Sequence, residues 1–372
     1  MIYLDHNATT PLDAEVKEAI IGAFPYFGNP SSSHDIGIAA KAIIDKARQQ
    51  VASSIGSGPS EIVFTSGGTE SNNLAIIGTA YRYQKGHIIT SVIEHPSVLN
   101  PVRWLEKNGF HVTYMPVDTG GIVSPETVRA ALRKDTILIT VMHANNETGV
   151  LQPIEEIGRI ARTAGVHFHS DAAQSMGKVE VNVAHLMVDM LTIVSHKFYG
   201  PKGTGALYVR DGVQLMPVLF GAGHERGLRP GTENTPLIAG LGKACEASAL
   251  KLADRYAHML ELRDTLYSLL AAGLELKLNG HHELRLPNTL NVSLKGIIAE
   301  DIIARLHDKI ALSAGSACHA GSRIPSPVLK AMGIPDADAL GSFRLSTGKD
   351  NTAAEIQIAA ELMISCIKGV RA

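Results

Sequence analysis

Short apolar runs alternate with helical patterns between about residue 60 and residue 210 of the sequence. The expected strands are near-continuous apolar segments such as EIVFTSG, TILITVMH and MLTIVSHK, and helical patterns such as IEEIGRIARTAG separate them. Apolar strands divided by helices are typical of a mostly parallel sheet that is covered on both faces. The pattern therefore predicts an α/β fold built on a large, mostly parallel sheet.

The pattern changes after a long helical stretch near residues 233–272. LKLNG, NTLNVSL, ALSAGSAC and FRLSTG read as strands, and AEDIIARLHDK, SPVLKAMG and TAAEIQIAAELMISCIKG read as helices. This mixture predicts a smaller α+β domain of about 100 residues. We expect a large domain at residues 14–255 and a small domain that combines residues 1–13 with residues 256–372.

The composition is that of a globular protein. Of the 372 residues, 45% are hydrophobic and 19% are charged, which argues against disorder, and the net charge of −2 predicts no general attraction to nucleic acid or acidic membranes. No apolar run reaches the roughly 18 residues of a membrane span. The start, MIYLDHNATTP, has neither the basic region nor the apolar core of a signal peptide. We therefore expect a cytoplasmic protein without a membrane partner.

Three cysteines are too few for a disulfide framework or a tetrathiolate metal site, so no metal is expected. Cys245 and Cys366 lie in helical patterns, where a free cysteine usually behaves as a small buried hydrophobic residue. Cys318 differs because it lies in SAGSACHAGS, among small residues that bury little surface. It is the cysteine that stands out as a candidate for chemistry.

Polar side chains follow several of the expected strands of the large domain. In open α/β sheets, ligands bind beyond the carboxyl ends of the strands. Ser66-Gly67-Gly68-Thr69 lies between a strand and a helix, where glycines and free N–H groups suit an anion such as a phosphate. Taken alone, however, this segment fits an ordinary glycine-rich turn in which Thr69 caps the helix.

Asp171 and Lys197 end two neighbouring strands and together suit pyridoxal 5'-phosphate. A lysine can bind the cofactor covalently, and a carboxylate can keep the pyridine nitrogen protonated, so that the ring accepts electrons from the substrate's α-carbon. The competing interpretation is a surface ion pair, which is common for these residue types. Lys202 is a rival for the covalent role, but it lies in a turn between glycines.

Four further residues gain meaning only in combination. His95 could lie on the cofactor ring and move protons, while Asn146 and Gln174 could hydrogen-bond its phenolate oxygen. Arg344 suits a bidentate clamp for an α-carboxylate, although an ion pair between domains would explain it equally well.

A run of motifs resembles the class V aminotransferase group, and within it the NifS/IscS-type cysteine desulfurases and the related selenocysteine lyases. The resemblance covers the chain from Tyr3 to Gly348. The motifs are YLDHNATTP, FGNPSSSH, FTSGGTESNN, EHPSV, HANNETG, HSDAAQ, SHKFYGPKGTGALYVR, GHERGLRPGTENTP, SAGSACHAG and FRLSTG.

The resemblance implies a pyridoxal-phosphate-dependent homodimer of fold type I and assigns a role to each matching residue. Lys197 would carry the cofactor, Asp171 would pair with the pyridine nitrogen, and His95 would stack on the ring. The remaining cofactor contacts would be Gly68, Thr69, Asn146, Gln174, Ser195, His196 and, from the other subunit, Thr232. Val194 stands where many relatives have a phosphate-binding serine, which leaves open whether Ser195 replaces it.

The function implied by the resemblance is that of a cysteine desulfurase. Arg344 and Asn146 would bind L-cysteine, and Cys318 would receive its sulfur as a persulfide while L-alanine leaves. The sulfur would pass to an acceptor protein such as an iron–sulfur scaffold, or serve thio-cofactor or tRNA biosynthesis. A selenocysteine lyase is the main alternative, because His319 follows the cysteine where many desulfurases have Thr or Ser. A plain aminotransferase and a non-catalytic binding module are the others.

Overall fold

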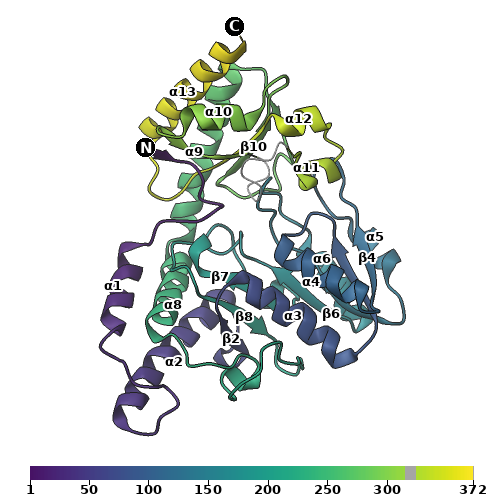
Figure 1. Ribbon diagram of the computed structural model, residues 1–372, viewed down its shortest axis with the longest axis vertical. Helices are drawn as coiled ribbons and strands as arrows, with labels where there is room; N and C mark the ends of the chain where they lie inside the picture. The colour runs from purple at the N-terminus through teal and green to yellow at the C-terminus, as the bar shows by residue number, and fades with distance from the viewer. Residues whose placement is uncertain (315–323, 372) are drawn as a thin grey trace.

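The computed structural model describes residues 1–314 and 324–371, and a seven-stranded sheet forms the centre of its larger part (Figure 1). Neighbouring strands are parallel from β7 through β6, β5 and β3 to β4, whereas β8 runs antiparallel to both β7 and β2. The order across the sheet is β2 (Ile62–Thr65), β8 (Gly205–Val209), β7 (Met190–Val194), β6 (His167–Asp171), β5 (Thr136–Thr140), β3 (His87–Ser91) and β4 (His111–Met115). The expected α/β fold with a mostly parallel sheet is confirmed.

Helices cover both faces of this sheet, as the apolar strands predict. On one face, α3 (Gly68–Tyr83) and α4 (Pro96–Lys107) pack on side chains such as Ile88 and Leu138. On the other face, neighbouring strand residues such as Ile89 and Ile139 pack against several helices. These are α1 (Ala14–Ala23), α2 (Asp35–Ile55), α5 (Pro125–Ala131), α6 (Ile154–Ala164) and α8 (Thr235–Leu250). Because alternate strand residues face opposite sides, one apolar run supplies both cores.

A second hydrophobic core lies in the smaller part of the molecule, at the top of Figure 1. A four-stranded antiparallel sheet has the order β12 (Ser313–Ala314), β13 (Ser342–Ser346), β10 (Thr289–Ser293) and β9 (Lys277–Leu278). The N-terminal β1 (Ile2–Tyr3) pairs with β11 (Ile310–Ala311), and Leu4 joins this core. Its main helices are α9 (Leu252–Gly273), α10 (Ala299–Leu306) and α13 (Ala353–Arg371).

β1 and Leu4 lie in the second core, whereas the assignment of residues 1–13 to a small domain stays a prediction. The boundaries at residues 13 and 255 stay a prediction, and α9 runs through the second of them. The helical stretch expected near 233–272 is divided at Lys251, where the backbone leaves the helical region. The short helix α11 (Pro327–Ala331) lies within SPVLKAMG, where the sequence predicts a helix. Two other short helices, α7 (Val183–Leu186) and α12 (Asp336–Leu340), were not predicted.

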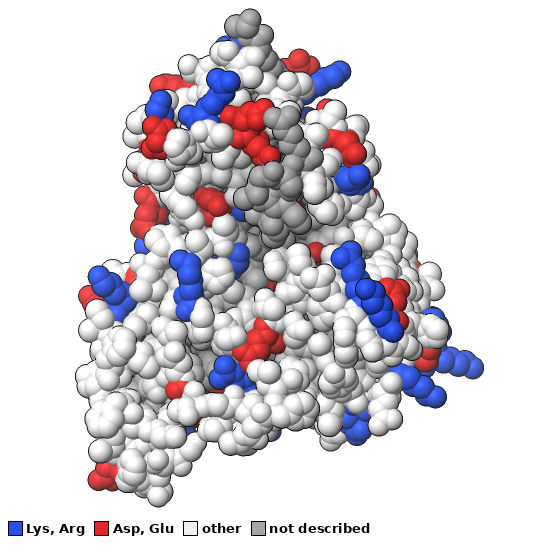
Figure 2. All heavy atoms as spheres, viewed as in Figure 1, with Lys and Arg blue, Asp and Glu red and all other residues white. Residues whose placement is uncertain are grey.

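Basic and acidic side chains are interspersed on the face shown in Figure 2, which agrees with the small net charge. Within residues 1–314 and 324–371, no helix is both long enough and apolar enough to cross a membrane. Cys245 is fully buried in the larger core, as its helical pattern predicts, and burial raises the pKa of its thiol to about 12.

Candidate active site

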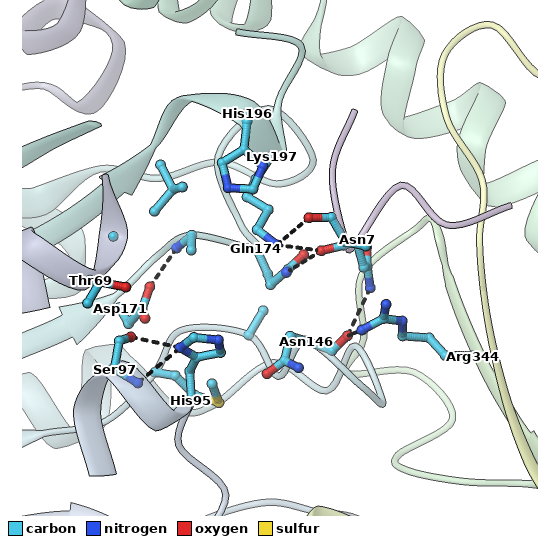
Figure 3. A pocket seen from close by; sticks show the side chains of 16 residues that line it. Asn7, Thr69, His95, Ser97, Asn146, Asp171, Gln174, His196, Lys197 and Arg344 are labelled. Carbon is cyan, nitrogen blue, oxygen red and sulfur yellow. Dashed lines mark hydrogen bonds between the residues drawn. The ribbon is translucent and has the colours of Figure 1, made fainter. Parts of the chain in front are cut away.

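A cavity of about 340 Å³ lies where the carboxyl ends of the parallel strands meet β13 and the N-terminal segment (Figure 3). Its size is within the usual range for small-molecule and cofactor sites. Segments from both parts of the molecule line it. They contribute Asn7, Ala8, Gly68, Thr69, His95, Ser97, Met142, Ala144, Asn146, Asp171, Ala173, Gln174, Val194, His196, Lys197 and Arg344.

Lys197 reaches the cavity from a short turn rather than from a strand. Strand β7 ends at Val194, and residues 195–197 form a 3₁₀ turn, although the sequence predicts a strand as far as the lysine. The Lys197 Nζ donates to the carbonyl oxygens of Asn7 at 2.7 Å and Ala8 at 2.8 Å. Lys202 is exposed and does not line the cavity. Of the two candidate lysines, the geometry favours Lys197.

Asp171 is the last residue of β6, as the sequence predicts, and its carboxylate is held by two donors. Oδ1 accepts from the Ala173 N–H at 2.9 Å, and Oδ2 accepts from Asn72 Nδ2 at 2.7 Å. Each oxygen keeps a further acceptor position, because an ionised carboxylate offers about four. The side chain is buried yet lines the cavity, so it presents a fixed negative charge to a ligand.

His95 caps the N-terminus of α4 with its imidazole ring. Nδ1 accepts from the Ser97 N–H at 3.2 Å and lies 2.7 Å from Ser97 Oγ. Burial lowers the pKa of His95, the Asp171 charge opposes this shift, and the Lys197 charge adds to it. Since a backbone N–H can only donate, the neutral ring carries its proton on Nε2. His95 can therefore donate a hydrogen bond from Nε2.

The N-terminus of α3 supplies the candidate phosphate site. The helix begins at Gly68 with Gly67 as its N-cap, so the expected capping role of Thr69 is wrong. Gly67 has a φ of 146°, which suits glycine, and a Cβ on Gly68 would lie 2.6 Å from Val194 Cγ2. The first N–H groups of a helix are free to bind an anion. The close packing of α3 on β7 explains why residue 68 is a glycine.

His196 lines the cavity, and its Nδ1 lies 3.1 Å from Thr9 Oγ1. Burial, together with the charges of Lys197, Lys202 and Lys178, lowers the pKa of His196 to about 4. The ring is therefore neutral at physiological pH. A neutral imidazole can still donate one N–H to a phosphate oxygen.

Two of the expected residues do not line this cavity, and a third lies outside the part of the chain that the structure describes. Ser195 is fully buried with its hydroxyl against Gly200, and Val194 lines the cavity in its place. Thr232 is exposed and is not part of the cavity lining. Cys318 lies outside the described residues. The roles of these three residues stay predictions.

Arg344 enters the cavity from β13, fully buried, and already has partners. Its Nη2 donates to Asp5 Oδ1 at 2.8 Å and to Ser313 Oγ at 3.2 Å, and its Nη1 donates to the Asn146 carbonyl at 3.2 Å. Its Nε has no partner among the described residues. A guanidinium that lines a cavity can bind a carboxylate, in competition with Asp5.

The sequence analysis missed several residues that organise the site. Asn7 is the most connected of them, because its main-chain and side-chain groups contact Lys197, Gln174 and the strands of the smaller part. Asn72 binds Asp171, Ser97 binds His95, and Lys178 binds Gln174. The polar residues directly after the short apolar start of the chain were the available signal for Asn7.

The polar groups that line this cavity fit pyridoxal 5'-phosphate. A helix N-terminus suits the phosphate, the Lys197 amine suits the aldehyde, and the buried Asp171 carboxylate suits the ring nitrogen. Asn146 and Gln174 line the same cavity, and their amide groups suit a hydrogen bond to the ring oxygen (Figure 3).

Comparisons with known proteins agree with this fit. The chain is 46% identical to "Cysteine desulfurase IscS" of Methanosarcina thermophila, over 100% of this chain and 93% of that protein. The solved structure of a "NIFS-LIKE PROTEIN" superimposes with a TM-score of 0.93 at 37% identity, covering 99% of both chains. "SspA in complex with cysteine" superimposes with a TM-score of 0.83 at 40% identity, covering 95% of this chain and 100% of that one.

The family model that matches is "Aminotransferase class-V", and it spans residues 2–358. Together with the full-length similarity, this match confirms the resemblance seen in the motifs and the fold type I that it implies. The chain belongs to the class V aminotransferase family, whose members depend on pyridoxal 5'-phosphate.

Proposed function

We propose that the protein is a pyridoxal-phosphate-dependent cysteine desulfurase that converts L-cysteine to L-alanine. The observation that carries the proposal is the convergence of Lys197 and Asp171 on one cavity, in a chain whose full-length relatives are named cysteine desulfurases. A solved relative that is described in complex with cysteine supports the same substrate.

The bound cofactor would supply an electron sink for the substrate's α-carbon. Lys197 would hold the cofactor covalently from the turn after β7, and Asp171 would keep a proton on the ring nitrogen. The two donors on Asp171 fix its direction, so its charge does not have to reorganise during the reaction. His95 would place its Nε2 proton beside the ring. Gln174 and Asn146 would bind the ring oxygen.

Arg344 would bind the α-carboxylate of L-cysteine, with Asn146 beside it. The Asp5 carboxylate that now pairs with Arg344 holds the guanidinium at the cavity, and a substrate carboxylate would share or displace this contact. Cys318 would then act as a thiolate that forms an S–S bond with the substrate sulfur, as the substrate's C–S bond breaks. Alanine would leave, and the persulfide would remain on the protein.

The cofactor phosphate would bind at the N-terminus of α3, with Gly68, Thr69 and His196 as the contacts of this chain. We propose that Thr232 of the partner subunit completes this site in a homodimer, because the chain's own Thr232 is exposed and away from the cavity. Ser195 is less well supported as a phosphate contact, since its hydroxyl faces Gly200.

Exposed apolar side chains support a homodimer. The connection between α1 and α2 exposes Phe24 and Phe27 by 64% and 80%, and the segment before α8 exposes Phe220 by 83%. Strongly exposed aromatic side chains that lie close together in the chain, such as Phe24 and Phe27, can mark an interface. The lower-left tip of the molecule in Figure 2, where α1 and α2 meet, carries few charges.

We also propose that the sulfur passes to an acceptor protein, such as an iron–sulfur scaffold, in the cytoplasm. The support is the similarity to proteins named cysteine desulfurase IscS, together with the acceptor that a protein-bound persulfide needs. The alternative of a selenocysteine lyase is less well supported, because the relatives reported above are named for cysteine.

Turnover of L-cysteine against L-selenocysteine tests the proposal directly. Alanine and the released chalcogen are measured separately for the wild type and for Lys197→Ala. We expect cysteine-dependent alanine formation that Lys197→Ala abolishes. Turnover of selenocysteine alone would instead support the lyase, and turnover of neither would overturn both.

A further inference from the structure

A buried lysine that the proposed mechanism does not use lies beneath the cavity. Lys178 is only 4% exposed and lies four residues after Gln174, in the turn that follows β6. Its Nζ donates to Gln174 Oε1 at 2.9 Å and to Asn7 Oδ1 at 3.3 Å. Lysine is rarely buried unless it is paired with a carboxylate. None of the described carboxylates lies within ion-pair distance of Lys178.

Neighbouring positive charges make the burial of a protonated Lys178 more costly. Desolvation lowers the pKa of Lys178 well below its usual value, and the positive charges of Lys197 and Arg344 lower it further. Both partners of the amine are neutral amide oxygens. A neutral amine still carries two N–H groups, so both contacts persist in either protonation state. A buried lysine without a carboxylate partner does not stabilise the fold, so we look for its role in the contact with Gln174, which lines the cavity.

Two contacts fix which way the Gln174 amide points. Lys178 donates to one end of the amide, so that end must be the oxygen, Oε1. The Asn7 main-chain carbonyl can only accept, and it lies 3.0 Å from the other end, which must be the nitrogen, Nε2. Nε2 carries a second N–H, and Gln174 lines the cavity (Figure 3). Gln174 therefore offers the cavity a donor and not an acceptor.

We propose that Lys178 is a positioning residue that fixes the Gln174 amide, so that an N–H group and not a carbonyl faces the cofactor's ring oxygen. The proposal rests on the proposed function, since it needs bound pyridoxal phosphate. A donor to the ring oxygen stabilises its anionic form and so weakens the hold of the adjacent cofactor–Lys197 linkage on its proton. Without Lys178 only the Asn7 carbonyl holds the amide, so its N–H group is positioned less firmly towards the ring oxygen and the linkage holds its proton more tightly.

The visible absorption of the bound cofactor reports this proton directly. We expect the pH midpoint of the absorption change to rise by about one unit in Lys178→Met, because the linkage keeps its proton to higher pH. Gln174→Met should raise the midpoint similarly. The double variant should show no further rise, because Lys178 acts through Gln174 and the two effects are then not additive.

Arg285→Met is the matched control. Arg285 is also a buried cation that donates to carbonyl oxygens, those of Thr148 and Asn279, at 2.8 and 3.1 Å. It does not line the cavity. We expect this variant to lose thermal stability, as Lys178→Met does, but to keep the wild-type midpoint. A midpoint that rises equally in Arg285→Met would show a general structural effect and overturn the proposal.

The pH midpoints of the Lys178 variants separate the positioning role from the proposed function. An unchanged midpoint in Lys178→Met, or a rise that persists in full in the Gln174→Met background, overturns the positioning role while cysteine turnover leaves the proposed function intact. A wild type without any cofactor band overturns both. If Lys178→Met does not fold, Lys178→Gln replaces it, because this variant keeps an N–H donor but holds the Gln174 amide less strictly. We then expect a smaller rise of the pH midpoint, and the absence of any rise would contradict the proposal.

Discussion

At the scale of single residues, the turn after β7 decides which lysine can carry the cofactor. Lys197 is held in the cavity by two main-chain carbonyls, whereas the side chain of Lys202 is exposed. Borohydride reduction of the cofactor-bound enzyme, followed by digestion and mass analysis, should tag the peptide that contains Lys197. Lys197→Ala should lose the tag, and Lys202→Ala should keep it. A tag that follows Lys202 would contradict the assignment.

Cys318 carries the functional distinction between a desulfurase and other members of the family. Cys318→Ala should leave cofactor binding close to that of the wild type, because the proposed cofactor contacts all lie elsewhere. Sulfur removal should fall by orders of magnitude, since loss of a covalent nucleophile usually costs several kcal/mol of transition-state stabilisation.

Cys245→Ala is the control for this experiment, because Cys245 is buried in the core and its loss should lower stability without a comparable effect on turnover. Near wild-type cysteine turnover in Cys318→Ala would show that Cys318 is not the sulfur acceptor.

Sequence reasoning could name the cavity residues that end strands, but not the residues that hold them. Asp171 and Lys197 follow apolar runs whose type is plain in the sequence. Asn7 follows only a short apolar start and Lys178 has no such signal, and the two side chains meet although they lie far apart in the chain. The orientation of Ser195 likewise depends on its packing against Gly200, which only the folded chain determines.

At the scale of elements, the contact between α3 and β7 places the phosphate site. In Gly68→Ala the new Cβ would lie 2.6 Å from Val194 Cγ2, too close for an unshifted backbone. We expect the helix N-terminus to move and the affinity for pyridoxal phosphate to fall by roughly tenfold or more, since about 1.4 kcal/mol of lost binding suffices for that. Equilibrium titration of the apo protein with the cofactor measures this.

Gly22→Ala is the matched substitution for this test. Gly22 lies within α1, and a Cβ there would meet nothing within 4 Å. Alanine in an unobstructed helix position should stabilise the protein by up to about 1 kcal/mol and leave cofactor affinity unchanged. Equal effects of the two substitutions on affinity would contradict the role of the close approach at Gly68.

The segment between β3 and α4 contains a buried carboxyl that makes stability depend on pH. Burial raises the pKa of Glu94 to about 8, although Ser91 and the Met142 N–H donate to its Oε1. The folded state then holds a proton that the unfolded state releases near pH 4.5, so the free energy of unfolding should fall as pH rises from about 5 to 8. The slope is about 1.4 kcal/mol per pH unit at most.

Glu94→Gln removes this titration while keeping the shape of the side chain. Denaturant unfolding at several pH values should show a shallower decline in the variant than in the wild type. The Glu147 carboxyl, whose pKa burial raises to about 7, contributes a decline in the same direction and remains in the variant. Parallel pH profiles for the two proteins would show that Glu94 is ionised in the folded state.

At the scale of the whole molecule, the fold class was predictable because the apolar strands identify a sheet that is buried on both faces. The apolar pattern alone gives little support for assigning the first residues to the smaller core, since β1 is only two residues long. The joining of the two cores was not predictable. It depends on polar contacts such as those of the Asn7 carbonyl with Gln174 and Lys197, which link the N-terminal segment to the larger part.

The proposed dimer predicts that cofactor binding depends on association. Phe27→Asp and Phe220→Asp each place a charge on strongly exposed apolar surface, so we expect each to shift the protein towards monomer in sedimentation experiments. If Thr232 of the partner subunit contacts the cofactor phosphate, the monomer loses that contact and binds pyridoxal phosphate more weakly. Thr232→Ala should weaken binding without changing the dimer.

Leu250→Asp controls for the added charge, because Leu250 is 79% exposed at the C-terminal end of α8, apart from both apolar segments. It should leave both the dimer and the cofactor affinity unchanged. The decisive comparison is made at one protein concentration, at which the wild type is dimeric. A fully active monomer with wild-type cofactor affinity would show that the active site is complete within one chain, and that Thr232 acts, if at all, within its own subunit.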